Sequence, residues 1–292
     1  MESSRITALR RSLVAEIGGD LDLDRHSLGD LIHRYLKNAR RQIVPAKRRV
    51  TFVRRFWDGG LVVRHLDKVF PLVRLIEEGS DLTPYLSSRA HRPGRHRRDL
   101  QHDGDFALAA YDVHHLHFDP VDPAGPLKIR KKDKEDVLLL GTFGQDHAVL
   151  IMVGTHDSFH DGTLEAAVVQ ARADAGHMVL NGVLGEAGLT ALQRTRMGLR
   201  GLNTAASIDG RAVLSSLVMG NGSSMRTRRM ADFAVWRIDD VDAVLDDVER
   251  ARELLGDRVP DAPVFSWRFD HTRLVLLEEV TATAFNFADQ PS

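Results

Sequence analysis

The sequence of 292 residues contains no cysteine. This absence excludes disulfide bonds, zinc sites built on thiolates, iron–sulfur clusters and cysteine nucleophiles. Disulfides belong to oxidising compartments, so a chain without cysteine suits a reducing compartment best. We therefore expect a cytoplasmic protein.

Long apolar runs are also missing. No segment reaches the roughly 18 consecutive apolar residues that a membrane-spanning helix needs. Residues 1–17 carry five charged side chains, which interrupt the apolar core that a secretory signal requires. We expect neither a membrane partner nor export. The chain likewise lacks the Gly-x-Ser-x-Gly, His-Glu-x-x-His and Asp-x-Asp-x-Asp-Gly motifs, which excludes the commoner hydrolase and calcium-binding families.

Charge is unevenly distributed, although the formal net charge is only −1. Residues 1–100 hold 21 Lys and Arg against 12 Asp and Glu, and residues 101–292 hold 19 against 29. A basic front suits a polyanion such as nucleic acid, or it packs against the acidic rear within one fold. Both interpretations stay open.

The pattern of apolar residues predicts an α+β fold. Residues 1–88 show helical spacing and form a basic, helical N-terminal part, with helices over 6–17, 26–43 and 66–78. Residues 89–180 begin with a basic loop and continue as an antiparallel β-meander over 109–118, 136–143 and 148–155, followed by a helix over 163–175. This histidine-rich part is the candidate active domain.

Residues 181–292 are predicted to form an acidic α+β C-terminal part. It begins with a short helix near 189–196 and a hairpin over 202–208 and 212–217, which turns at Asp209-Gly210. A long helical pattern then runs to Leu255 with Phe233 and Trp236 on its buried face, and strands over 264–269 and 274–280 close the chain.

Histidine carries the functional signal. The chain has 14 histidines, and nine of them fall between residues 91 and 160. Side chains alternate along a strand, so His115 and His117 share one face of the sheet and His114 lies on the other. The end of the third meander strand adds His156 and His160. We expect several of these imidazoles to converge.

Imidazoles that titrate near neutral pH are suited to acid and base catalysis of phosphodiester cleavage without a metal. In this interpretation His115, His117 and His156 transfer protons, and cations stabilise the phosphate. The basic loop supplies Arg95, and the segment before residue 136 supplies Arg130 and Lys132. The sequence thus predicts a metal-independent ribonuclease that needs no cofactor.

A helical N-terminal part, an antiparallel meander and a basic, histidine-bearing sheet face resemble the RelE-like and barnase-like ribonucleases found among bacterial toxins. The resemblance covers about residues 89–175 and rests on topology and residue type. It implies a toxin-like or defence-related ribonuclease, and it assigns no catalytic residue by itself.

Two alternatives use the same sequence differently. In the first, His115 and His117 bind a divalent metal such as zinc in a hydrolase, together with His156 or His160 as the third ligand. Asp112 or Asp157 would complete or orient this site. The set His115, His117 and His160 is the metal-site alternative to the catalytic set. In the second, the basic front binds nucleic acid or protein without catalysis. The expected partners are RNA and a protein partner or inhibitor, and the sequence leaves a homo-oligomer open.

Overall fold

A computed structural model describes residues 2–18, 21–87, 90, 105–121, 136–184 and 188–287. The fold is α+β, as predicted. The chain forms two compact units, of which the first joins Met1–Arg40 to Arg226–Ser292 and the second comprises Arg41–Met225. These bounds differ from the consecutive stretches 1–88, 89–180 and 181–292, because the first two helices pack with C-terminal elements. No described helix is both long and apolar enough to cross a membrane.

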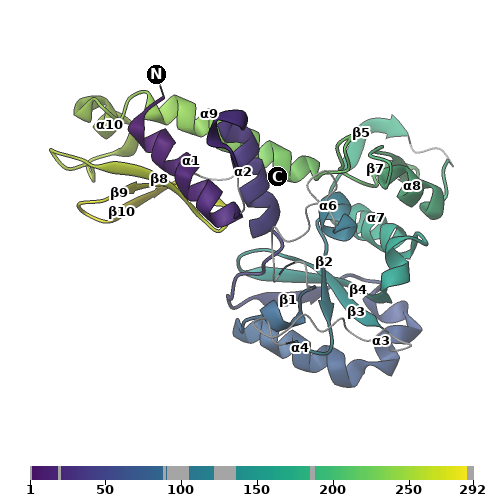
Figure 1. Cartoon of the computed structure of the whole chain (residues 1–292). Coiled ribbons are helices and arrows are strands. Elements are labelled where there is room, and N and C mark those ends of the chain that lie inside the picture. Colours follow the sequence, from purple (N-terminus) through teal and green to yellow (C-terminus); the bar gives the residue numbers. More distant parts are fainter. Residues whose placement is uncertain are drawn as a thin grey trace. The chain divides into compact units, whose positions relative to one another are not determined.

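The first unit packs helices against a small antiparallel sheet with strand order β10-β9-β8. Leu13 of α1 and Leu31 of α2 share one apolar core with Trp267 of β8. In Figure 1, α1 (purple) lies beside these strands (yellow). The elements of this unit are α1 (Ser4–Ile17), η1 (Leu23–Arg25), α2 (Leu28–Ala39), α9 (Met225–Asp242), α10 (Val248–Leu255), β8 (Phe265–Asp270), β9 (Arg273–Glu278) and β10 (Thr283–Asn286).

Two predictions for the first unit are wrong. The helical pattern that was expected to run to Leu255 is broken, because α9 ends at Asp242 and the side chain of Asp247 caps a new helix, α10. Trp236 is 55% exposed instead of buried. The guanidinium of Arg237 lies 4.7 Å from its ring centroid, so a cation–π contact covers part of the indole. The predicted closing hairpin is confirmed, and β10 extends it.

The second unit contains a four-stranded sheet and a three-stranded sheet. Its elements are β1 (Arg49–Phe52), η2 (Phe56–Asp58), α3 (Gly60–Arg64), α4 (Leu66–Glu78), η3 (Thr83–Tyr85), α6 (Phe106–Tyr111), β2 (His114–His117), β3 (Val137–Phe143), β4 (His147–Thr155), η5 (His156–Phe159), α7 (Thr163–Ala175), β5 (Val179–Leu184), α8 (Ala191–Gly198), β6 (Ala205–Ile208) and β7 (Arg211–Leu214).

The larger sheet has the strand order β1-β4-β3-β2. Its strands β2, β3 and β4 pair antiparallel, as the meander prediction requires. The sequence did not reveal β1, which adds a parallel edge strand beside β4. Buried Arg48, just before β1, donates hydrogen bonds to the carbonyl oxygens of Gly144, Ala46 and Val44, and so ties β1 to the β3–β4 turn.

Helices cover both faces of this sheet (Figure 1). On one face, Leu72 and Ile76 of α4 pack against Leu139 and Leu150. On the other face, Leu164 and Val168 of α7 join residues of α6 and the side chains of Leu138 and Leu140. The helix predicted over residues 66–78 is confirmed, and Gly79 ends it in the left-handed conformation that favours glycine.

The strand predicted over residues 109–118 is partly wrong. Residues 106–111 form α6, and only His114–His117 form the strand β2. The Asp105 side chain accepts a hydrogen bond from the backbone N–H of Leu108, which caps a segment rich in the strong helix former alanine. Asp112 ends this helix with φ 62°. The capped helix therefore sets the start of β2.

The smaller sheet has the strand order β5-β7-β6. The predicted hairpin between β6 and β7 is confirmed, and both turn residues, Asp209 and Gly210, have positive φ values of 50° and 75°. Such a turn matches the twist of the flanking strands. The sequence did not reveal β5, which pairs with β7.

Candidate metal centre

The pairing of β2 with β3 fixes where the strand histidines point. His115 lies opposite Leu140, and His117 lies opposite Leu138. Directly opposite residues share a face of the sheet, and Leu138 and Leu140 belong to the core beneath α6 and α7. His115 and His117 therefore point to that face. His114 packs edge-on against Phe143 instead, so the predicted alternation is confirmed.

His156 reaches the same place from the end of β4. It opens the 3₁₀ turn η5, which is closed by a reciprocal capping box between Thr155 and Ser158. The Ser158 hydroxyl accepts a hydrogen bond from the Thr155 N–H at 3.2 Å. The turn redirects the chain just past the strand, and it aims the imidazole of His156 toward β2.

The three imidazoles converge. One ring nitrogen from each of His115, His117 and His156 lies within 4.8 Å of the other two. His115 and His117 are only 8% and 6% exposed, whereas the side chain of His156 is 45% exposed. The cluster therefore has a buried base and one side that is open to solvent.

Two carboxylates, those of Asp105 and Asp136, lie near the Nδ1 atoms of the three imidazoles. Asp136 precedes β3, and its Oδ2 and Oδ1 lie 2.7 Å from His156 Nδ1 and 3.3 Å from His117 Nδ1. Asp105 lies with Oδ2 3.7 Å from His115 Nδ1, while its Oδ1 caps α6. His117 and His156 thus have a carboxylate within contact distance of Nδ1, the arrangement by which proteins orient histidine ligands of metals. The separation between Asp105 and His115 is too long for a hydrogen bond.

An aromatic ring borders the cluster. The ring centroid of Phe159, at the end of η5, lies 5.3 Å from that of His115 and 5.5 Å from that of His156. An apolar wall of this kind excludes water from one side of a polar site and strengthens its electrostatic interactions.

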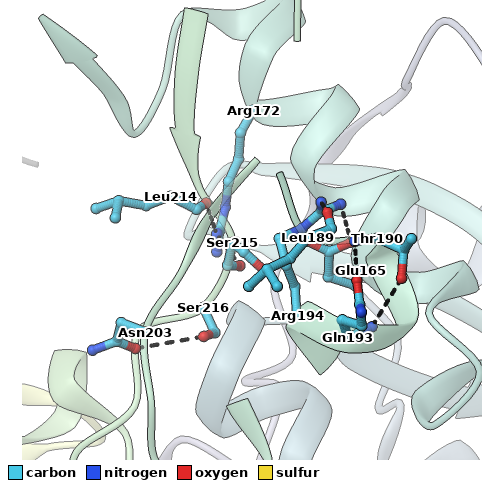
Figure 2. Close-up of polar contacts among 10 residues, drawn as sticks. All are labelled: Glu165, Arg172, Leu189, Thr190, Gln193, Arg194, Asn203, Leu214, Ser215 and Ser216. Carbon is cyan, nitrogen blue, oxygen red and sulfur yellow. Dashed lines mark hydrogen bonds and ion pairs between the residues drawn. The ribbon is translucent and has the colours of Figure 1, made fainter. Parts of the chain in front are cut away.

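One arginine, Arg172, connects elements next to the site. Arg172 of α7 donates hydrogen bonds to the carbonyl oxygens of Leu214 and Ser215, which Figure 2 shows, and to that of Tyr111 at the end of α6. Burial lowers the pKa of Arg172. Asp105 caps the start of α6 and β2 follows its end, so the hydrogen bond to Tyr111 connects α7 to the segment between Asp105 and β2.

The structure brings some of the predicted site residues together and leaves others outside the cluster. His115, His117 and His156 come together, whereas His160, the alternative to His156 as third metal ligand, is the C-cap residue of η5 and is not part of the group of three. The carboxylates found beside the imidazoles are Asp105 and Asp136, in place of Asp112 at the end of α6 and Asp157, which is exposed. Arg95, Arg130 and Lys132 lie outside the described residues.

The sequence analysis missed Asp136, although a signal for it exists. Val137 of β3 pairs with Thr155 of β4, so extending the register by one residue places Asp136 opposite His156. Position 136 also shares a face with Leu138, which lies opposite His117. This signal requires knowledge of how β3 pairs with β2 and β4. The alternation of side chains along a single strand does not give that pairing.

The spacing of the three nitrogens suits one cation. Zinc binds imidazole nitrogen at about 2.0–2.1 Å, which places two ligand nitrogens of a tetrahedral site about 3.4 Å apart. The nitrogens lie up to 4.8 Å apart, so the imidazoles would have to move closer together to bind one ion. Three imidazoles suit zinc and other first-row transition metals, and they leave a coordination position for water.

Comparisons with protein-family models, with curated proteins and with solved structures give no match to this chain. The resemblance to RelE-like and barnase-like ribonucleases therefore stays a prediction, and the functional argument depends on the geometry of the site.

Proposed function

We propose that this protein is a metal-dependent hydrolase in which His115, His117 and His156 hold a divalent cation, with zinc as the leading candidate. The single observation that carries the proposal is the convergence of these imidazoles within 4.8 Å, with the carboxylate of Asp136 near Nδ1 of both His117 and His156. Burying His115 and His117 beside each other and beside His156 costs free energy unless the polar ring nitrogens find partners, and a shared cation would supply one.

The chemistry follows from the open side of the cluster. A divalent cation with three imidazole ligands lowers the pKa of a bound water toward about 7, which provides a nucleophile at neutral pH. In hydrolysis of a phosphodiester, the water oxygen bonds to phosphorus and the bond from phosphorus to the leaving oxygen breaks. The water loses its proton to solvent, and the leaving oxygen gains one.

The substrate class that we propose is RNA. The sequence close to Asp136 is strongly cationic and includes Lys128, Arg130, Lys131 and Lys132, and a second basic stretch, residues 89–98, precedes Asp105. Both carboxylates of the site thus adjoin basic sequence, which suits a polyanionic backbone. Together with the absence of cysteine, an RNA substrate fits action in the cytoplasm.

A second candidate is the metal-independent ribonuclease. The contact of 2.7 Å between Asp136 and the half-exposed His156 favours it, because a carboxylate that orients an accessible imidazole is the arrangement of a general base. In this candidate His156 accepts a proton directly and no cation is required.

Cleavage of RNA under metal control separates the two candidates. Purified protein is incubated with total RNA as isolated, after treatment with EDTA, and after addition of Zn²⁺, Mn²⁺ or Mg²⁺ to the treated protein. The proposal predicts cleavage that EDTA abolishes and one of the metals restores. Cleavage that persists in EDTA favours the metal-independent ribonuclease. Binding of RNA without cleavage under any condition contradicts both candidates and favours a regulator.

A further inference from the structure

We propose that Asp136 is the positioning residue of this site, a shared carboxylate that fixes both His117 and His156 as Nδ1–H tautomers so that both present Nε2 to the cation. The part that concerns the cation rests on the proposed function. The part that concerns the tautomers does not, because it follows from contacts within the protein.

The argument begins with the two contacts of Asp136. Its two oxygens divide between two rings, Oδ2 at 2.7 Å from His156 Nδ1 and Oδ1 at 3.3 Å from His117 Nδ1. An ionised carboxylate only accepts hydrogen bonds, so each facing nitrogen must carry the hydrogen. A neutral imidazole has one such hydrogen, and therefore Nε2 of both rings keeps its lone pair.

The surroundings of Asp136 hold it in this role. Its side chain is 35% exposed, so the carboxylate is partly shielded from water that would compete for its oxygens. Asp136 directly precedes Val137, the first residue of β3. Val137 pairs with Thr155, which is the residue before His156. The backbone of Asp136 is thus anchored next to one of its two partners.

An amide cannot replace this carboxylate. In Asp136→Asn one oxygen still accepts a hydrogen bond, whereas the amide nitrogen carries hydrogens and can only donate. One of the two rings must then turn away or adopt the Nε2–H tautomer, which removes its lone pair from the cluster. The side chain keeps its size, so the substitution changes hydrogen bonding and charge with little change in packing.

The tautomers are measurable without any metal. Protein labelled with ¹⁵N-histidine and freed of metal is examined at pH 8 by long-range ¹H–¹⁵N correlation spectra, which identify the protonated nitrogen of each ring. Wild-type protein should show His117 and His156 as Nδ1–H tautomers, and Asp136→Asn should shift at least one of them toward the Nε2–H form. Asp146→Asn, which alters the exposed pair of Asp146 with His147, is the matched control and should leave both site rings unchanged.

Cation binding supplies the second readout. Competition with a chromogenic chelator should show Zn²⁺ binding about 10–100-fold more weakly to Asp136→Asn than to wild type or Asp146→Asn, as loss of a carboxylate behind a histidine ligand does in metal sites. Equal affinities would overturn the positioning role. An Nε2–H tautomer of either ring in wild-type protein would also overturn it, whether or not the variant folds. Correct tautomers without any Zn²⁺ binding would contradict the proposed function and leave the tautomer assignment intact.

Discussion

Arg194 of α8 donates two hydrogen bonds to the carboxylate of Glu165 of α7 (Figure 2). Nε lies 2.6 Å from Oε1, and Nη2 lies 2.9 Å from Oε2. Glu165 is 1% exposed and also accepts a hydrogen bond from the hydroxyl of Ser215. Removing one partner of a buried pair leaves the other charge uncompensated. Glu165→Ala should therefore lower the free energy of unfolding by about 3–5 kcal/mol.

Urea denaturation of both proteins measures this loss. Asp174→Ala is the control, because Asp174 lies on the same helix, is exposed and accepts a surface hydrogen bond from Gln170. That substitution should cost less than about 1 kcal/mol. Similar losses for both variants would show that the Glu165 network does not anchor α7.

The histidine cluster contains one residue that separates function from stability. His156 is half-exposed, so His156→Ala removes a ligand without opening a large cavity in the core. The variant should lose hydrolysis by at least 100-fold, while its thermal midpoint without metal stays within a few degrees of wild type. His147→Ala, at an exposed position at the start of β4, should retain full activity. Full activity in His156→Ala would remove this residue from the site.

Acid should reveal a second buried carboxylate, Glu278 at the end of β9. Burial by itself raises the pKa of Glu278. Hydrogen bonds from the Thr281 hydroxyl and from the backbone N–H groups of Val264, Thr281 and Val280 outweigh this effect and lower the pKa to about 2. A lowered folded-state pKa gives stability that is complete above the unfolded-state value near 4.5 and is lost as the pH falls toward 2.

Glu278→Gln does not titrate, so its unfolding midpoint in urea should fall less steeply than that of wild type between pH 4.5 and pH 2. Glu279→Gln, at the neighbouring exposed position, should follow the wild-type curve. Parallel curves for Glu278→Gln and wild type would show that this carboxylate titrates normally in the folded protein.

The basic residues that the sequence assigns to phosphate binding are tested by salt. Replacing Arg95, Arg130 or Lys132 by Ala should weaken RNA binding and reduce the slope of log K against log salt by about 0.7 for each lost contact with single-stranded RNA. Fluorescence anisotropy with a labelled oligonucleotide measures the slope. A slope that stays at the wild-type value would show that the replaced residue does not contact a phosphate.

Much of this fold could be predicted from local sequence patterns. The helix over residues 66–78 ends at Gly79, and the hairpin at Asp209-Gly210 forms, because their termination and turn chemistry are local. Elements that depend on distant partners were missed. The parallel strand β1 has only four residues and gains its hydrogen bonds from β4, about 100 residues later in the chain. The pattern of apolar residues around Ala109 predicted a strand, but the Asp105 side chain caps a helix there.

The candidate site also combines features that local sequence patterns predict with features that depend on distant parts of the chain. Alternation along β2 predicted that His115 and His117 share a face, and clustering in the sequence pointed to His156. The sequence left the third ligand open between His156 and His160, because the 3₁₀ turn after Thr155 decides which of the two imidazoles lies beside β2. Asp136 became visible only through the pairing register of β3 with both of its neighbours.

Titration of the metal-free protein with Co²⁺ tests the central claim most directly, because this ion replaces zinc and reports its coordination through visible absorption. We predict saturation at one equivalent, with intense bands of a tetrahedral site and displacement by Zn²⁺, and loss of this signal in His156→Ala but not in His147→Ala. A protein that binds no Co²⁺, or binds it equally well without His156, would contradict a metal centre built from His115, His117 and His156.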